Sequence, residues 1–354
     1  MKRTKLSWRS IYPALRVWAM KHGPLKLTVH SSFHDIFKGY HFVSVSLVGL
    51  RYAVVGFSVE KSKSMARNKA VSELFENLLS EVSGWLKHPS GVGVGYSKSI
   101  ANQKAKMELY ERDRFFNHYL TSLPFLSSAE LDELKLQSSY QEFERELGQF
   151  GIEVVAKEML PMRNYRFVII HCFGSKAPVK NFGVVLGVGS GLNLSSALAH
   201  ACCEARMLIY MVVGKQVSPW IPKGNKYWVD NPYFSHHLYG RKLETADRWR
   251  KKFVDTHVRL YENRSTWLPV ITFKSSFIQL EPNDNKSVRL FFSVAQSSDI
   301  QEAFWGAKSF SKGVPIESVV NTRANVRFIQ EFKETVGTQC KFRICAPKSP
   351  HIFS

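Results

Sequence analysis

The chain has 354 residues, and its hydrophobic content of 44% is enough for a packed core in one large or two ordinary domains, which excludes a disordered protein. Its formal net charge of +20 favours an acidic partner: nucleic acid, an anionic surface, or an acidic peptide or nucleotide. The five cysteines include no C-x-x-C pair, so neither a disulfide framework nor a zinc site is expected. No long apolar run is present, so we expect a cytoplasmic protein with no membrane partner.

Strand and helix patterns alternate along the chain. The expected strands are residues 25–30, 41–48, 51–57, 92–96, 152–155, 165–172, 182–188, 270–273, 277–280, 288–294 and 340–345. The expected helices are residues 63–82, 99–119, 127–149, 195–213, 243–263, 300–310 and 323–336. Strands that feed helices in this way predict an α+β fold with mixed sheets. We expect a strand-rich segment with a first acidic helix at 1–90 and a catalytic domain at 91–354, or one continuous domain.

Three of the expected helices carry the motif Ala-x-x-x-Ala-x-x-Glu, at residues 62–77, 97–112 and 193–206. The alanines and glutamates share one helix face, because positions three and four apart are neighbours on a helix. Carboxylates on an alanine-lined face are costly to bury unless a cation meets them, and a hard cation takes oxygen ligands. The first two helices extend the motif to Glu-x-x-Glu and could form a cage for magnesium-bound phosphates. The alternative is two amphipathic helices whose glutamates lie in water.

A glycine-containing strand end precedes each of the three motifs. Gly56 precedes the first, GVGVG (91–95) the second and GVGSG (187–191) the third, and we expect the last run to turn directly into its helix. Neither run is followed by the Gly-Lys-Ser/Thr of a phosphate-binding loop. Tight packing of strand against helix is therefore favoured over a direct phosphate cradle.

These segments resemble the three conserved segments of YcaO proteins. VGVGYSKSIANQKAKMELYERDRFF (92–116) resembles the second segment, in which a glycine-rich strand leads into a helix that ends in Glu-x-x-Glu-Arg-Asp. LGVGSGLNLSSALAHACCEAR (186–206) is similar to the third segment, and GFSVEKSKSMARNKAVSELFEN (56–77) to the first. The resemblance implies a YcaO-like α+β enzyme that uses ATP and Mg²⁺ to modify a peptide backbone.

The resemblance also implies a site, a substrate and a partner, but it assigns no catalytic residue. The substrate would be a ribosomally made peptide with a leader, modified to an azoline ring or a thioamide as in bacteriocin maturation. A partner protein would recognise the leader. The residues implied to bind ATP are Glu73, Glu76, Glu108, Glu111, Arg112 and Glu204, of which Glu73, Glu76, Glu108 and Glu111 would hold Mg²⁺.

The chain departs from the YcaO pattern at several positions. The first segment ends at Glu76-Asn77 without the expected arginine, Met207 occupies a position that is usually polar, and the ending PKSPHIFS lacks a proline-rich run. These departures leave open a catalytically degenerate scaffold subunit of a modifying complex.

A non-enzymatic nucleic-acid-binding protein is the other alternative. Three strands followed by a lysine-rich, alanine-lined helix resemble a double-stranded-RNA-binding domain, which would suit the net charge. In that case Lys61, Lys63, Arg67 and Lys69 would face phosphates. The recurrence of the same lysine pattern before Glu111-Arg112-Asp113 favours the enzyme.

Overall fold

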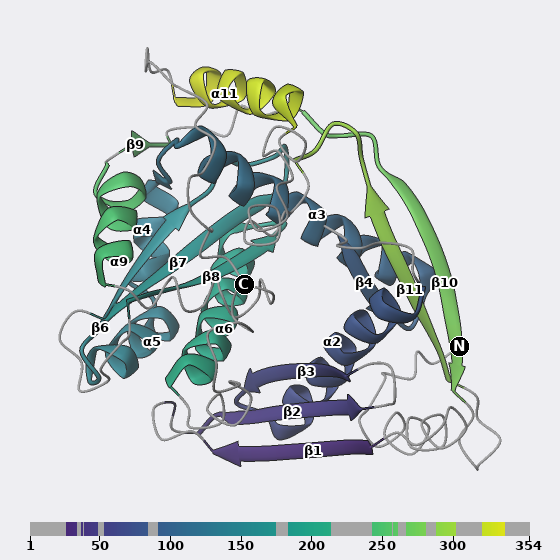
Figure 1. Ribbon diagram of the computed structural model, residues 1–354. Coiled ribbons are helices and arrows are strands. Elements are labelled where there is room, and N and C mark those ends of the chain that lie inside the picture. The colour runs from purple at the N-terminus through teal and green to yellow at the C-terminus, as the bar shows by residue number, and fades with distance from the viewer. Residues whose placement is uncertain are drawn as a thin grey trace. The chain divides into compact units, whose positions relative to one another are not determined.

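The computed structural model describes residues 26–33, 37, 39–48, 53–83, 91–174, 183–213, 243–256, 258–260, 267–280, 288–301 and 321–336. Helices and sheets alternate through this part of the chain, which confirms the α+β class (Figure 1). The chain divides into two compact units, one within Met1–Leu109 and Ile271–Ser297 and one within Tyr110–Val270 and Ser298–Ser354. The expected division into 1–90 and 91–354 stays a prediction.

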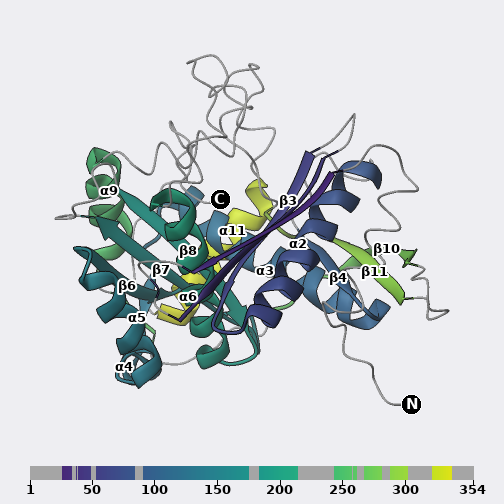
Figure 2. The same cartoon turned by 90° about the horizontal axis from the view of Figure 1, so that it is seen from below.

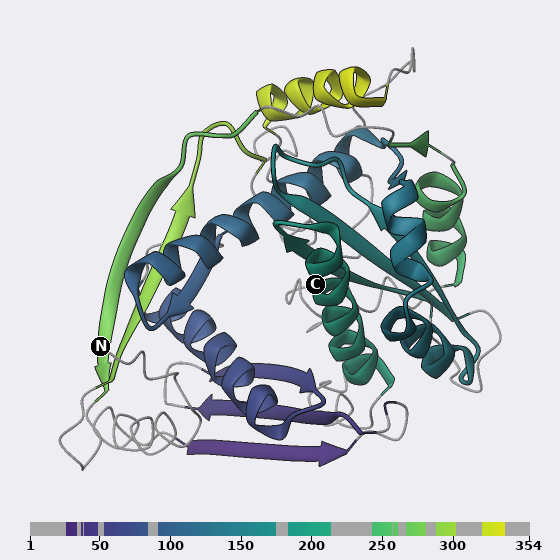
Figure 3. The same cartoon turned by 180° about the vertical axis from the view of Figure 1, so that it is seen from behind.

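The first unit contains two antiparallel three-stranded sheets. One has the order β1-β2-β3, from β1 (Lys26–Phe33), β2 (His41–Val48) and β3 (Ala53–Glu60). The other has the order β10-β11-β4, from β10 (Thr272–Leu280), β11 (Val288–Gln296) and β4 (Val92–Gly95). Helix α2 (Lys63–Ser83) follows β3 and packs against β2 and β3, as Figures 1 and 3 show from opposite sides. Helix α3 (Lys98–Thr121) follows β4.

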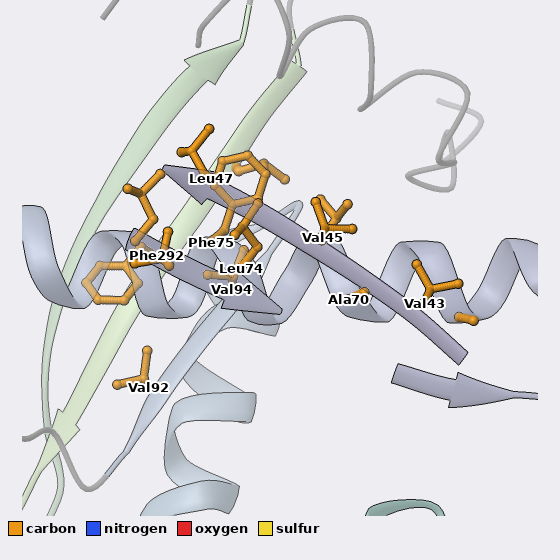
Figure 4. Packing of buried hydrophobic residues seen from close by; sticks show 14 of the residues in the cluster. Val43, Val45, Leu47, Ala70, Leu74, Phe75, Val92, Val94 and Phe292 are labelled. Carbon is orange, nitrogen blue, oxygen red and sulfur yellow. The ribbon is translucent and has the colours of Figure 1, made fainter. Parts of the chain in front are cut away.

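A single apolar cluster joins these elements of the first unit. Alternate residues of β2 point toward α2, because successive side chains of a strand face opposite sides of the sheet. The cluster also includes residues of β4 and β11, so that α2 shares its core with both sheets. Its labelled members in Figure 4 are Val43, Val45, Leu47, Ala70, Leu74, Phe75, Val92, Val94 and Phe292.

The second unit is built on one five-stranded sheet of order β8-β7-β6-β5-β9. Its strands are β5 (Leu126–Ser127), β6 (Ile152–Glu158), β7 (Arg166–Gly174), β8 (Val184–Gly191) and β9 (Val258–Arg259). Helix α6 (Leu194–Val213) packs on β7 and β8, which Figure 2 shows from below. The other helices among the described residues are α4 (Ala129–Lys135), α5 (Ser138–Gly148), α9 (Leu243–Trp249), the π-helix η2 (Arg250–Val254) and α11 (Thr322–Val336).

Two expected helices were wrong in extent. The stretch 127–149 forms α4 and α5, because the amides of Leu136 and Gln137 bond carbonyls only three residues back and close the first helix in a tight turn. The stretch 243–263 contains only α9 and η2. Beyond them Val258 pairs with Leu126 and the amide of Leu260 bonds the carbonyl of Ser127, so the chain joins the sheet instead of extending the helix.

The strand expectations need two corrections. Residues 270–273 and 277–280 were expected as separate strands, but β10 is continuous, and its residues pair with β11 through Ser275 and Ser276. The run 187–191 was expected as a turn, but it lies in β8, since Gly187–Gly191 pair in register with β7. The strand expected at 340–345 lies outside the described residues, as does nearly all of the helix expected at 300–310.

A buried ionic network anchors the second half of α3 to α11. Arg114 has no exposed side-chain surface, and its guanidinium lies 2.9 Å from the Glu331 carboxylate. Arg327 lies 3.3 Å from Glu331 and 3.8 Å from Asp113, whose carboxylate also accepts the Gln301 amide at 2.8 Å. Buried charges are tolerable only when paired in this way. The Glu-Arg-Asp tripeptide therefore contributes a structural residue, Asp113, that the motif alone did not reveal.

In the described part of the chain, no helix combines the length and apolar character needed to span a lipid bilayer.

Candidate functional site

A strand packed closely against the helix that follows it occurs three times, as β3–α2, β4–α3 and β8–α6. The spacing leaves no room for a side chain on the strand. A Cβ added to Gly56 would lie 2.0 Å from the Ala70 carbonyl oxygen, and one added to Gly189 would lie 2.3 Å from that of Ala197. The glycine runs therefore serve tight packing against alanine-lined helices, which confirms the interpretation favoured from the sequence.

The first glutamate of each of the two Glu-x-x-Glu motifs bonds the strand of its own repeat. The Phe57 amide donates to Glu73 Oε2 at 2.7 Å, and the Val92 amide donates to Glu108 Oε2 at 2.7 Å. Both bonds span 16 residues, so the two repeats use the same geometry. Each of these two glutamates is half-buried against a strand. The alternative of amphipathic helices whose glutamates lie in water is therefore wrong for this pair.

The second glutamate of each motif reaches the strand of the next repeat. The Val94 amide donates to Glu76 Oε1 at 3.2 Å. The Ser190 side chain hydrogen-bonds the Glu111 carboxylate. Val94 and Ser190 are equivalent positions when the repeats are aligned on their alanines, since each lies seven residues before Ala101 or Ala197. The Glu-x-x-Glu spacing thus links consecutive strand–helix pairs.

In the first unit, Glu76, Glu108 and Lys104 form what we call the first acidic cluster. The pKa of Glu76 is raised to about 7, chiefly by burial and also by the charge of Glu108, while Lys104 and the Val94 amide act in the opposite direction. Lys104 Nζ also donates to Ser72 Oγ at 3.1 Å. Two half-buried carboxylates repel each other when both are ionised, and a bound cation would offset this repulsion.

In the second unit, Glu111, His200 and Glu204 form the second acidic cluster. His200 Nδ1 lies 4.0 Å from Glu111 Oε2, and Nε2 lies 3.7 Å from Glu204 Oε1. His200 Nδ1 also lies 3.4 Å from the Ser190 amide nitrogen. Burial raises the pKa of Glu111, and the neighbouring His200 lowers it.

His200 and Lys104 are members of the two clusters that the sequence motifs did not indicate. His200 precedes Glu204 by one helical turn, so an i, i+4 search for polar pairs on α6 would have found it. Lys104 is one of several lysines in its stretch, and only the fold brings it beside Ser72, 32 residues earlier in the chain.

Each acidic cluster could hold a metal ion only together with further oxygen ligands. Among the described residues, no group of three or more His, Cys, Asp or Glu side chains is arranged to hold a metal ion by itself. Each cluster offers two carboxylates, the donor type that Mg²⁺ takes together with substrate phosphates. Glu73 bonds the Phe57 amide at the β3–α2 pair. Arg112 lowers the pKa of Glu111 and so supplies positive charge beside the second acidic cluster.

No protein family and no curated protein matches the chain in sequence. Solved structures do match. YcaO from Methanopyrus kandleri, bound with AMPPCP and Mg²⁺, aligns with a TM-score of 0.54 over 82% of this chain and 90% of that chain, at 11% identity. The chain has the YcaO fold. The Escherichia coli microcin synthetase McbBCD complex aligns with a TM-score of 0.57 over 79% of this chain and 89% of the matched chain, at 10% identity. The same complex with pro-MccB17 bound reaches 0.59 over 80% and 90%, again at 10% identity. The YcaO resemblance drawn from the three segments is confirmed for the fold.

Proposed function

We propose that the chain is an ATP-dependent enzyme that activates backbone amides of a ribosomally made peptide, with an azoline ring or a thioamide as the product. The observation that carries the proposal is the gathering of four of the five repeat glutamates, all but Glu73, into two clusters on a YcaO fold. A similar structure, the Methanopyrus kandleri YcaO, is described with an ATP analogue and Mg²⁺ bound. Another is a microcin synthetase with pro-MccB17 bound.

In this proposal, the acidic clusters hold Mg²⁺ through carboxylates that the fold has already oriented. Glu108 is fixed by the Val92 amide and Glu76 by the Val94 amide, so that neither side chain has to be ordered when the ligand arrives. Bound Mg²⁺ and ATP would supply the phosphoryl group and neutralise its developing charge. Lys104 would stabilise phosphates at the first acidic cluster, and Arg112 and Glu204 would contribute at the second.

Phosphoryl transfer relies mainly on positioning and charge neutralisation. The residues named here suit those two tasks, and we assign no general base or nucleophile within the chain. The attacking group would come from the peptide's own Cys, Ser or Thr side chain, or from an external sulfide. A partner protein would present the leader.

The decisive experiment is isothermal titration calorimetry of Mg-ATP with the wild type and with Glu108→Gln/Glu111→Gln. A glutamine oxygen can still accept the Val92 amide bond, so the fold should survive while the ligand charge is lost. We expect affinity to fall by about tenfold or more, as expected when charged ligands are removed from a phosphate–metal site. The exposed pair Glu133→Gln/Glu144→Gln is the matched control and should bind normally.

Unchanged affinity in Glu108→Gln/Glu111→Gln would remove the catalytic assignment. Mass spectrometry of a co-expressed precursor peptide, measured for loss of water or exchange of oxygen for sulfur, then tests the reaction itself. Nucleotide binding without any peptide modification would instead support the degenerate scaffold subunit.

Duplex RNA binding remains the second candidate, because the antiparallel β1-β2-β3 sheet is followed directly by α2 with exposed Lys61 and Lys63 at its start. Another lysine that this candidate assigns to phosphate binding, Lys69, forms an ion pair with Glu60. Retention on duplex RNA that falls steeply with salt, and is lost in Lys61→Glu/Lys63→Glu, would support it. Salt-insensitive or absent retention would exclude it.

A further inference from the structure

Strand β10 forms the outer edge of the β10-β11-β4 sheet in the first unit. It runs over nine residues, Thr272–Leu280, and among the described strands it pairs only with β11. Figures 1 and 3 show it as the outermost strand of its sheet. The outer side of such a strand presents backbone amides and carbonyls in the spacing that another extended chain can match.

The side chains of β10 protect this edge only lightly, because the strand has one charged residue, the exposed Lys274, and no proline. Phe273 is 38% exposed and Phe277 is 53% exposed, on the same face of the strand because they are four residues apart. Arg289 of the neighbouring strand β11 stacks over the Phe277 ring at 5.4 Å. Edge strands usually carry charges or proline to discourage pairing, and Lys274 would repel a basic chain but attract an acidic one. The exposed aromatic side chains are typical of a binding surface.

A basic hollow lies beside this face, where the first turns of α3 pass Phe273. It is lined by Lys98, Ser99, Asn102, Gln103, Lys106 and Phe273. Its floor is ordered, because the hydroxyls of Ser275 and Ser293 donate to Asn102 Oδ1 at 3.1 Å and 2.6 Å. Two lysines and no carboxylate among the lining residues make the hollow complementary to negative charge.

We propose that β10 docks an acidic peptide in extended conformation. The peptide adds as a further strand on the outer side of β10, sets apolar side chains against Phe273 and Phe277, and places carboxylates near Lys98 and Lys106. A second copy of this chain fits less well, because two chains of formal charge +20 repel each other. Nucleic acid has no backbone amides or carbonyls to pair with a strand edge.

Peptide docking at β10 does not depend on the proposed ATP chemistry. Naming the peptide as a segment of the substrate to be modified rests on the proposed function, but binding at β10 does not. A binding assay without ATP therefore separates the two proposals. The chain could be an active enzyme that binds no peptide at β10, or it could bind the peptide at β10 without being an enzyme.

The test is fluorescence anisotropy with a labelled synthetic peptide that alternates aspartate with valine and phenylalanine, at physiological ionic strength. A companion peptide carries N-methyl groups on alternate amides, which removes strand pairing but keeps the charge. Lys98→Glu/Lys106→Glu and Phe273→Ser/Phe277→Ser are compared with wild type. Lys251→Glu/Lys333→Glu is the control, because it changes the net charge equally at two exposed sites elsewhere.

We expect both test variants and the N-methylated peptide to lower the affinity about tenfold or more, and the control variant to change it less than about threefold. Circular dichroism verifies that every variant is folded. Failure of the peptide to bind, or equal affinity for the N-methylated peptide, overturns the proposal. So does an equal loss in Lys98→Glu/Lys106→Glu and the control, which would indicate attraction by net charge alone. A dimer that Phe277→Lys dissolves would identify a second copy as the occupant, and would also overturn it.

Discussion

Replacing Gly56 by alanine should destabilise the first unit, because the strand–helix contact has no space for one methyl group. The added Cβ would lie 2.0 Å from the Ala70 carbonyl oxygen and 2.4 Å from the Leu74 nitrogen. Both are backbone atoms of α2 and cannot rotate away. The helix would have to move by roughly 1 Å or more to restore a normal contact, which would open the core on which α2 packs. Overpacking of this kind costs about 1–3 kcal/mol, and we expect the upper end, about 3 kcal/mol.

Urea denaturation followed by circular dichroism measures the loss of stability, and hydrogen exchange with mass spectrometry locates it. Amides of α2 and β3 should lose protection in Gly56→Ala, because the local free energy of opening falls with the packing. Gly148→Ala is the control, since a Cβ at that position meets nothing within 4 Å. If Gly56→Ala keeps the wild-type urea midpoint and the wild-type protection in α2, glycine is not required for close packing, and the packing interpretation of all three repeats is wrong.

Three further outcomes can be tested by urea denaturation. Arg114→Met should cost about 3 kcal/mol by leaving the Glu331 carboxylate with a weaker set of partners, and adding Glu331→Leu should restore most of that loss; a single variant as stable as wild type would contradict the role of the network. Burial lowers the pKa of His118 to about 3, so between pH 6.5 and 3 the unfolded state binds more protons, stability falls as pH decreases, and His118→Gln should show a shallower fall. Burial raises the pKa of Glu76 to about 7, so the folded state binds more protons between pH 4.5 and 7, and stability is lost as pH rises through that window. Glu76→Gln should flatten this second dependence, and an unchanged slope would place the titration elsewhere.

The glutamates of the repeats combine two properties that were hard to reconcile from the sequence. They lie on the alanine face of their helices, yet a buried carboxylate needs a partner. The partners are backbone amides such as those of Phe57 and Val94, which belong to strands and leave no trace in the residue pattern. A carboxylate has about four acceptor sites, so an amide bond leaves capacity for a metal. The same residues can therefore hold the fold and orient a ligand.

The helix and strand types of most segments could be predicted from the sequence, because periodicity reports which side of an element is buried. The positions of the three alanine-lined helices followed from local spacing alone, as did the first two glycine-bearing strands, whereas the extension of β8 to Gly191 did not. The continuity of β10 and the end of α9 could not be predicted, since pairing with β11 and the joining of Val258 to β5 outweigh local preference.

The same distinction between local spacing and tertiary contacts applies to the candidate site. The sequence by itself determined which carboxylates share a helix face, because helical geometry depends only on spacing. Tertiary structure alone decided what each carboxylate meets: Lys104 with Ser72 beside Glu76, and His200 between Glu111 and Glu204. Such contacts join residues far apart in the chain, and they arise from the way the core packs, which no local pattern of residues encodes.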